Sequence, residues 1–210
     1  MNGLFVTFEG GEGSGKSTQI QRLAVHLRSR GEIVLETREP GGTPLAERVR
    51  ALLLDPGHDP GPWAEAFLME AARADVIARL IAPELALGHV VLCDRFADST
   101  LAYQGGGRGL DLELLTAMNR AATGGREPDL TLLFDLEPAV GLARRARAAP
   151  MTNRIDREPE AFHVRVRERF LALARANPER WVVLDAGLDH DRLERAVLDA
   201  VHPRLAASGR

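Results

Sequence analysis

Lys16 is the only lysine of this 210-residue chain, and every other long basic side chain is an arginine. It follows a run of small residues, so that residues 10–17 read Gly-Gly-Glu-Gly-Ser-Gly-Lys-Ser. This octet fits the pattern G-x-x-x-x-G-K-[ST], whose glycines let backbone N–H groups surround phosphate oxygens. A lysine ammonium can follow a phosphoryl group as it moves, and the Ser17 hydroxyl can bind Mg²⁺. The octet therefore predicts a phosphate-binding loop.

The sequence on both sides of the octet predicts the elements that such a loop requires. Residues 4–8 form a short apolar run that is typical of a buried strand. Residues 18–27 follow with helical spacing, because apolar side chains recur on one face from Ile20 to Leu27. Strand, loop and helix together favour a phosphate loop over the alternative, a glycine-rich turn with an exposed lysine.

Composition places the chain among ordinary globular proteins. An apolar fraction of 45%, a net charge of −3 and a pI of about 6.1 argue against nucleic-acid binding by bulk charge. No run approaches the roughly 18 apolar residues of a membrane span, and no secretory leader is recognised. Cys93 is the single cysteine and lies in an apolar run, which suits a core residue in a reducing compartment. We expect one domain over residues 1–210, in the cytoplasm, with no membrane or nucleic-acid partner.

Five short apolar runs alternate with longer helical patterns, which predicts an α/β fold with a parallel sheet. The expected strands span residues 4–8, 32–36, 89–93, 130–135 and 181–185. Besides 18–27, the expected helices span residues 63–87 with a break near Pro83, 112–122, 139–148, 158–176 and 190–205. In such folds ligands bind beyond the carboxyl ends of the strands. The loop should therefore meet residues 38–43 and 94–96 in one cleft.

Two charged side chains follow the third expected strand. Asp94 ends that strand, and an acid at the end of a strand beside a phosphate loop commonly helps to hold Mg²⁺. Asp135 has a similar position, although Glu137-Pro138 after it is typical of an ordinary helix start. Capping of the next helix is the alternative role for both acids. We favour Asp94, because Arg95 beside it supplies a forked group that binds anions.

Arginines are concentrated in residues 144–154, around Pro150. A solvated charged face explains such a run in most proteins. Beside a phosphate loop, the same segment can close over a nucleotide, exclude water and stabilise charge on a transferred phosphoryl group. We favour this second interpretation and expect a mobile lid. The polar, glycine-rich segment 103–109 is interpreted as a flexible turn.

Three segments share their order and spacing with one enzyme family. Residues 8–18 read Phe-Glu-Gly-Gly-Glu-Gly-Ser-Gly-Lys-Ser-Thr, residues 37–43 read Thr-Arg-Glu-Pro-Gly-Gly-Thr, and residues 94–105 read Asp-Arg-Phe-Ala-Asp-Ser-Thr-Leu-Ala-Tyr-Gln-Gly. In these the chain resembles the bacterial thymidylate kinases, which transfer the γ-phosphate of ATP to dTMP in dTTP biosynthesis. The resemblance implies a three-layer phosphate-loop NTPase fold with a five-stranded parallel sheet flanked by helices. It also implies an arginine-rich lid at about 144–157, Mg²⁺ as cofactor, and a homodimer.

The resemblance further implies two substrate sites. ATP would be bound by Gly10, Gly11, Glu12, Gly13, Ser14, Gly15, Lys16, Ser17 and Thr18. The dTMP site would comprise Glu12, Arg38, Pro40, Met69, Arg73, Arg95, Ser99, Thr100, Tyr103 and Gln104. Mg²⁺ would be held by Ser17 and Asp94, and catalysis would fall to Lys16, Arg95, Arg147 and Arg154.

Individual roles in the dTMP site follow from the same resemblance. Glu12 would accept a hydrogen bond from the 3′-hydroxyl of the acceptor sugar, where its charge would repel a 3′-phosphate. Arg95 would hold the dTMP phosphate, and Arg73 would donate to the pyrimidine edge. Tyr103 would lie under the sugar and crowd a 2′-hydroxyl, which suggests how a deoxynucleotide is chosen.

Three positions distinguish this chain within the family pattern. Some members carry a catalytic arginine where this chain has Gly13, and others supply it from the lid, which directs attention to Arg147 and Arg154. Met69 stands where a phenylalanine usually stacks on thymine, and a methionine sulfur packs on rings with less selectivity. Residues 153–156 read Asn-Arg-Ile-Asp in place of the more usual Asp-Arg-Ile-Glu.

Two other functions are compatible with parts of the sequence. A different nucleotide or nucleoside kinase would share the loop and the lid, and Met69 leaves that acceptor choice open. A nucleotide-dependent switch would need the loop alone. The chain has no Asn-Lys-x-Asp motif that reads guanine, and Glu12, Arg73 and Arg95 supply a second site for which a simple switch has no use.

Overall fold

The computed structural model describes residues 3–148 and 153–207. It contains one five-stranded sheet in the order β2-β3-β1-β4-β5, and all its strands are parallel. The strands are β1 (Leu4–Glu9), β2 (Val34–Arg38), β3 (Val90–Asp94), β4 (Leu130–Asp135) and β5 (Trp181–Asp185). The predicted α/β fold is confirmed. The β2 strand begins later than expected, because Gly31 and Glu32 donate backbone hydrogen bonds to the end of the preceding helix.

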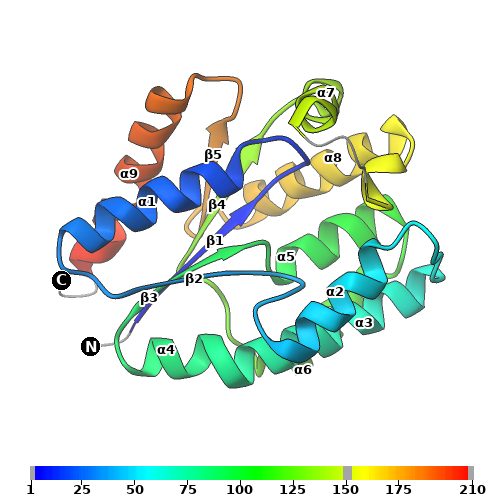
Figure 1. The fold of residues 1–210 in the computed structure, drawn as a ribbon, viewed down its shortest axis with the longest axis horizontal. Coiled ribbons are helices and arrows are strands. Elements are labelled where there is room, and N and C mark those ends of the chain that lie inside the picture. Colours follow the sequence, from blue (N-terminus) through cyan, green and yellow to red (C-terminus); the bar gives the residue numbers. More distant parts are fainter. Residues whose placement is uncertain (1–2, 149–152, 208–210) are drawn as a thin grey trace.

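Helices cover both faces of the sheet (Figure 1). The α-helices are α1 (Lys16–Ser29), α2 (Pro44–Leu54), α3 (Pro62–Val76), α4 (Ala82–Ala86), α5 (Ala97–Thr100), α6 (Leu112–Thr123), α7 (Pro138–Ala148), α8 (Glu160–Ala176) and α9 (His190–Ala207). Two π-helical segments, η1 (Ile77–Ile81) and η2 (Leu101–Gly107), and one 3₁₀ turn, η3 (Ile155–Arg157), join them. In the part of the chain that the structure describes, no helix is long and apolar enough to cross a membrane.

Alternating side chains of the strands build a separate core on each face of the sheet. Leu4, Val6 and Phe8 of β1 pack with α1 and α9 on one face. Phe5 points to the other face, where it joins the buried side chains of α2, α3, η1 and α4. A third cluster on this second face joins Leu133 of β4 to α8 and η2. The sheet is therefore the middle of three layers, as expected, and its carboxyl edge is left for the site.

The long helical segment from α3 to α4 runs through Pro83 instead of breaking there. Proline lacks a backbone N–H, and its ring crowds the carbonyl four residues earlier, which here belongs to Arg79. The preceding turn, η1, is π-helical and hence wider than an α-helical turn. The wider turn accommodates the proline ring, so the segment bends without ending.

Helix α2 was not among the expected elements, although the sequence contains the signals for it. Thr43 is a favoured N-cap residue, Pro44 after it suits the first helical position, and Glu47 adds an acid to the first turn. The Thr43 Oγ1 accepts a hydrogen bond from the Ala46 backbone N–H at 3.2 Å. The helix buries Ala46, Val49 and Leu53 on one face. Its carboxyl-terminal end, including Arg50 and Leu54, borders the candidate site.

The expectation of a flexible turn over residues 103–109 was wrong for most of that segment. Residues 101–107 form the helical segment η2, which packs against α8 and α6. Its glycines are needed for this packing, because a Cβ at Gly107 would lie 2.4 Å from a ring carbon of Phe162. The glycines thus permit close contact of helices and do not mark a flexible connector.

Replacing Gly107 with alanine should destabilise the protein. The added methyl group would overlap the Phe162 ring, and overpacking of this kind costs about 1–3 kcal/mol. Gly61→Ala is the matched control, because Gly61 has a φ of −56° and open space around its Cβ position. Chemical denaturation should show a clear loss of unfolding free energy for Gly107→Ala and little change for Gly61→Ala. Equal stability of the two variants would contradict the packing argument.

Candidate active site

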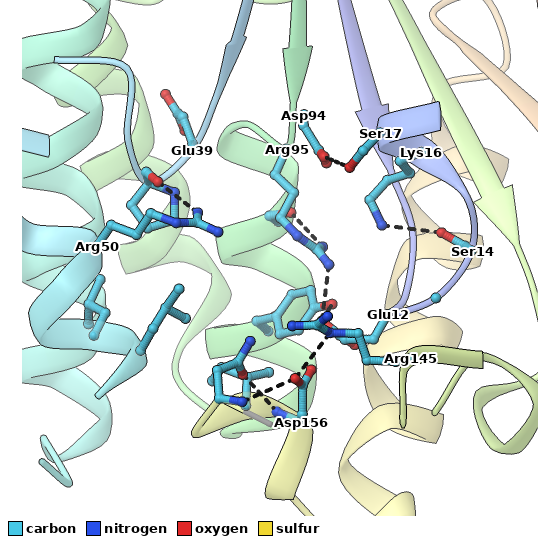
Figure 2. Close-up of a pocket in the computed structure, with 18 of the residues that line it drawn as sticks. Glu12, Ser14, Lys16, Ser17, Glu39, Arg50, Asp94, Arg95, Arg145 and Asp156 are labelled. Atoms are coloured by element: carbon cyan, nitrogen blue, oxygen red, sulfur yellow. Dashed lines mark hydrogen bonds and ion pairs between the residues drawn. The ribbon is translucent and has the colours of Figure 1, made fainter. Parts of the chain in front are cut away.

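A cavity of about 570 Å³ opens at the carboxyl edge of the sheet (Figure 2). Its walls come from the loop after β1, the ends of β2 and β3, helices α2 and α3, η2, and residues 144–145 and 153–156. Glu39, Pro40, Asp94 and Arg95 line it together with the phosphate loop. The predicted convergence of three distant segments on one cleft is therefore confirmed.

The phosphate loop holds the single lysine by its own carbonyls. The Lys16 Nζ donates to the carbonyls of Gly10 at 3.1 Å and Gly11 at 2.8 Å, and to the Ser14 hydroxyl at 3.2 Å. Burial, together with the charge of nearby Arg95, lowers the pKa of Lys16 to about 8. Lys16 is the first residue of α1, so the positive end of that helix points toward the loop. The arrangement suits binding of phosphate oxygens.

Ser17 and Asp94 lie together, as expected for a metal site. The Ser17 Oγ donates to the Asp94 Oδ2 at 2.9 Å, and both side chains line the cavity. The Asp94 Oδ1 is buried and has no hydrogen-bond partner among the described residues. A hydroxyl and a carboxylate are the hard oxygen ligands that Mg²⁺ takes, with waters and substrate phosphates completing its shell. The donor set therefore fits Mg²⁺.

Arg95 stands at the corner between β3 and α5 and joins three parts of the site. Its Nη1 donates to the Gly10 carbonyl at 3.0 Å, and its Nη2 donates to the Glu12 Oε1 at 3.0 Å. Its guanidinium also lies over the Tyr103 ring, 4.8 Å from the ring centroid. The cationic group is thereby fixed in the cavity next to the loop.

Glu12 is the acidic counterpart of these cations. Besides Arg95, the Tyr103 hydroxyl donates to its Oε1 at 2.7 Å, and the His163 Nδ1 lies 3.3 Å from its Oε2. Burial by itself would raise the pKa of Glu12, but His163, Arg95, Lys16 and Tyr103 together lower it to about 2. Glu12 is therefore a carboxylate at any ordinary pH and can accept a hydrogen bond from a ligand.

Gly13 brings the loop into direct contact with α7. A Cβ at Gly13 would lie 2.1 Å from the Gly141 carbonyl oxygen, and a Cβ at Gly141 would lie 2.3 Å from the Glu12 carbonyl oxygen. Backbone therefore touches backbone at this point. The contact fixes the position of the first turn of α7, the helix that carries arginines near its carboxyl end.

Arg50 lines the cavity and was not among the predicted site residues. It lies on α2, and its Nη1 donates to the Pro40 carbonyl at 2.9 Å (Figure 2). Arg50 and Arg95 line the same cavity, so two guanidinium groups face it. If α2 had been predicted from its start signals, Arg50 could have been identified as a candidate site residue, because it lies one turn after the buried Ala46.

Arg73 lies behind the cavity and is absent from its lining. Its side chain has an exposed fraction of 0%, and its Nε donates to the Glu39 Oε2 at 2.8 Å. Its Nη1 contacts Glu70 and donates to the Asn119 Oδ1 at 2.7 Å and the Thr100 Oγ1 at 3.0 Å. Arg73 therefore holds β2, α3, α5 and α6 together.

Arg38 and Thr100 are likewise absent from the cavity lining, because Arg38 pairs with Glu47 at the surface and Thr100 is fully buried. The structure does bring most predicted acceptor residues to the cavity. These are Glu12, Pro40, Met69, Arg95, Ser99, Tyr103 and Gln104.

The arginines of the lid segment are placed differently from one another. Arg144 and Arg145 line the cavity, where the Arg144 Nη1 donates to the Ala186 carbonyl at 2.9 Å and the Arg145 Nε donates to Asp156 at 3.2 Å. Arg147 is exposed and does not line it. Residues 149–152 of the expected lid lie outside the described residues.

Arg154 lines the cavity where α2 and α3 form its wall. Its guanidinium forms an ion pair with Glu65 of α3, and its Nε donates to the Leu53 carbonyl of α2 at 3.2 Å. Glu65 also accepts from the Gln104 Nε2 at 2.7 Å and from Arg108 at 3.2 Å. The described end of the expected lid segment is thus docked onto the wall formed by α2 and α3.

Comparison with known proteins decides the family. The family model described as thymidylate kinase matches residues 8–197 of the chain. The chain belongs to the thymidylate kinase family. It is 50% identical over 202 residues to the thymidylate kinase of Deinococcus radiodurans, covering 96% of this chain and 98% of that protein. It is 51% identical over 211 residues to that of Pseudomonas fluorescens, covering 100% of both.

A solved structure supports the same family. The thymidylate kinase of Ehrlichia chaffeensis has a TM-score of 0.79 and 32% sequence identity to this chain, covering 96% of this chain and 99% of that one. The resemblance predicted from three short segments therefore extends over the whole fold.

Glu9 lies beneath the site and is fully buried. Its Oε1 is bonded to the Phe96 backbone N–H at 2.8 Å, and its Oε2 is bonded to the Ser99 hydroxyl at 2.6 Å. Burial, reinforced by the nearby charge of Asp98, raises the pKa of Glu9 to about 8. Glu39 is a second buried acid, and burial raises its pKa to about 7.

These raised pKa values predict that the free energy of unfolding falls as the pH rises. Folded Glu9 keeps its proton until about pH 8, whereas a solvated glutamate in the unfolded chain releases it near pKa 4.5. The unfolded state therefore gains stability relative to the folded state between these values. Glu9→Gln removes this titration. The free energy of unfolding of the variant should therefore fall less with rising pH than that of the native protein, by on the order of 1–3 kcal/mol.

Chemical denaturation of both proteins at about pH 5 and about pH 8 measures this difference. The Glu39 contribution is common to both proteins and cancels in the comparison. Parallel declines in the two proteins would show that Glu9 does not titrate in this window.

Proposed function

We propose that the chain phosphorylates dTMP to dTDP with ATP as the phosphoryl donor, within dTTP biosynthesis. The observation that carries this proposal is a single cavity lined by cations from separate elements. Lys16 lies in the phosphate loop, Arg95 lies next to it, and Arg50 faces the same cavity from α2. A cavity of this kind can hold two phosphate groups side by side. Membership in the thymidylate kinase family supports dTMP as the acceptor.

The chemistry asks these residues to position groups and to neutralise charge. Both reacting groups are phosphates, so the acceptor needs no strong base to remove a proton. Lys16 would contact the transferred phosphoryl group, and the loop amides would bind the other ATP phosphates. Ser17 and Asp94 would hold Mg²⁺, which supplies positive charge to the ATP phosphates when bound.

The acceptor side supplies a contact for each part of dTMP. Arg95 and Arg50 would bind its phosphate, because forked guanidinium groups match phosphate oxygens. Glu12 would accept from the 3′-hydroxyl of the sugar, with Tyr103 beside it. Met69 and Gln104 line the same wall and would contact the base. Arg73 lies behind this wall, bonded to Glu39 and Thr100, so the donation to the pyrimidine edge that the family resemblance implies would require its side chain to turn into the cavity.

The arginine-rich segment at about 144–157 would act as the lid. Position 13 of the loop is a glycine and supplies no arginine, so a catalytic arginine that acts beside Lys16 would come from the lid. Arg147 and Arg154 are the catalytic candidates by family resemblance, and Arg144 and Arg145 already line the cavity. The Arg154–Glu65 ion pair suggests that Arg154 also anchors the closed lid to the acceptor wall.

We also propose a cytoplasmic, single-domain protein that forms a homodimer. The lone cysteine, Cys93, is buried and free, which suits a reducing compartment. Helix α3 contacts both α2 and α6 in the layer on the second face of the sheet. The three helices expose large apolar side chains that would suit a partner subunit, namely Leu45, Leu52, Phe67 and Leu114.

The proposed function predicts that ADP release depends on the acceptor. ADP formation from ATP and Mg²⁺ would be measured by a coupled assay with dTMP, dUMP, UMP, CMP and dGMP offered separately. We expect dTMP to give the highest kcat/KM, and the ribonucleotide UMP to be a poor acceptor because Tyr103 crowds a 2′-hydroxyl. Similar activity on several pyrimidine monophosphates would keep the kinase but withdraw the base specificity. No acceptor-dependent ADP, with ATP still bound, would favour a nucleotide switch.

Arg154→Ala should lower turnover more than it weakens dTMP binding. The variant loses the ion pair to Glu65 and the bond to the Leu53 carbonyl, so the lid would no longer be held over the reacting groups. We expect kcat to fall by about tenfold or more, with a smaller change in KM for dTMP. Arg192→Ala, on the exposed surface of α9, is the matched control. Unchanged turnover of Arg154→Ala would assign the role to Arg144, Arg145 or Arg147.

A further inference from the structure

Arg95 adopts a backbone conformation that few residues tolerate. Among the described residues it is the one non-glycine with a positive φ, at 70°. The left-handed region costs an ordinary residue about 1–2 kcal/mol, so neighbouring contacts have to hold the chain there. The conformation occurs at the corner between β3 and α5, where the side chain turns into the cavity.

Glu9 makes the contacts that secure this corner. Its two oxygens bind the Phe96 backbone N–H at 2.8 Å and the Ser99 hydroxyl at 2.6 Å. Phe96 directly follows Arg95 and is the residue before the first turn of α5, and it has no side-chain oxygen with which to cap that helix. Glu9 therefore serves as a cap supplied from another strand, which fixes the chain immediately after Arg95.

The residues around Glu9 hold Arg95 itself. The Phe8 carbonyl accepts from the Arg95 backbone N–H at 2.9 Å. The Gly10 carbonyl and the Glu12 carboxylate accept from its guanidinium, each at 3.0 Å. The end of β1 and the loop thus bind both the backbone N–H and the guanidinium of Arg95. Glu9 lies between these residues and binds the backbone N–H of Phe96, the next residue of the chain.

We propose that Glu9 is a positioning residue for the acceptor phosphate, acting through the backbone of Arg95 and the start of α5. The inference rests on the proposed function only in taking Arg95 as the group that binds the acceptor phosphate. A direct role as proton acceptor is excluded by the geometry, because Glu9 is fully buried, does not line the cavity and has both oxygens committed.

Length, and not charge, should be the property of Glu9 that matters. A glutamine amide has the same reach, can accept from the Phe96 N–H through its oxygen and can donate to the Ser99 hydroxyl through its nitrogen. An aspartate keeps the acid but is shorter by one methylene and cannot reach both groups at once. Burial raises the pKa of Glu9 to about 8, so a neutral side chain is already the native form at neutral pH.

The test compares Glu9→Asp and Glu9→Gln by steady-state kinetics in both substrates. We expect Glu9→Asp to raise KM for dTMP about tenfold or more, with KM for ATP within about twofold of the native value. Glu9→Gln should keep both constants close to native. The control is Thr7→Val, which removes a buried polar group of the same strand whose partner is Thr131. It should leave KM for dTMP unchanged.

A double-mutant cycle with Arg95→Ala shows whether Glu9 acts through Arg95. The Glu9→Asp effect on KM for dTMP should largely disappear when Arg95 is absent. An equal effect in both backgrounds would overturn the proposal, as would Glu9→Gln being impaired as strongly as Glu9→Asp, or KM for ATP rising in step with that for dTMP. If Glu9→Asp fails to fold, an impaired but folded Glu9→Gln overturns it by itself. Lack of dTMP turnover in the unaltered protein would instead overturn the proposed function.

Discussion

The binding of Arg95 by the end of β1 and the phosphate loop is the interaction on which the site depends. It joins the phosphate loop to the corner that follows β3, and it places a second cation close to Lys16. Burial lowers the pKa of Lys16, and repulsion from the nearby Arg95 cation lowers it further. Glu12 and Asp94 offset part of the charge. The remaining positive charge makes the cavity suitable for binding anions such as phosphate groups.

Buried carboxylates give the acceptor wall its rigidity. Arg73 joins Glu39 and Glu70 in the interior, and Glu65 receives Gln104, Arg108 and Arg154 at the cavity rim. Loss of one partner from a buried pair costs about 3–5 kcal/mol, whereas an exposed pair is worth about 0–1 kcal/mol. The wall that would meet the nucleoside is therefore held in one shape before a ligand arrives. Glu65 binds both Arg154 of the expected lid segment and Gln104 of that wall. A displacement of Arg154 would therefore alter the contacts of the wall.

Much of this architecture could be predicted from the sequence, because its strands are short apolar runs and its loop has a fixed pattern. The runs at 130–135 and 181–185 correspond to the β4 and β5 strands at both ends. Helix α2 and its Arg50 were missed, although a start signal at Thr43 was available. The helical η2 could not be predicted from local composition, since its glycines are explained by side chains of α6 and α8 against which they pack, such as Phe162 for Gly107.

The placement of Arg73 also required the structure. A helix pattern places Arg73 on α3, one turn from Glu70, but does not reveal that Glu39 and Asn119 meet it behind the cavity. Side chains that meet across separate elements are set by the tertiary packing, and local periodicity does not encode them. The lid arginines show the same limit, since Arg144, Arg147 and Arg154 have different surroundings despite their proximity in the sequence.

The backbone contact between Gly13 and Gly141 restricts how this enzyme can evolve. An arginine acquired at position 13 would collide with the Gly141 carbonyl before its guanidinium could assist the reaction, because even a Cβ would lie 2.1 Å from that oxygen. Room for it would appear only if α7 moved away, and α7 carries the arginines that approach the cavity from the lid. An arginine at position 13 and the present position of α7 therefore exclude each other, so a substitution at position 13 would have to be accompanied by changes that displace the helix.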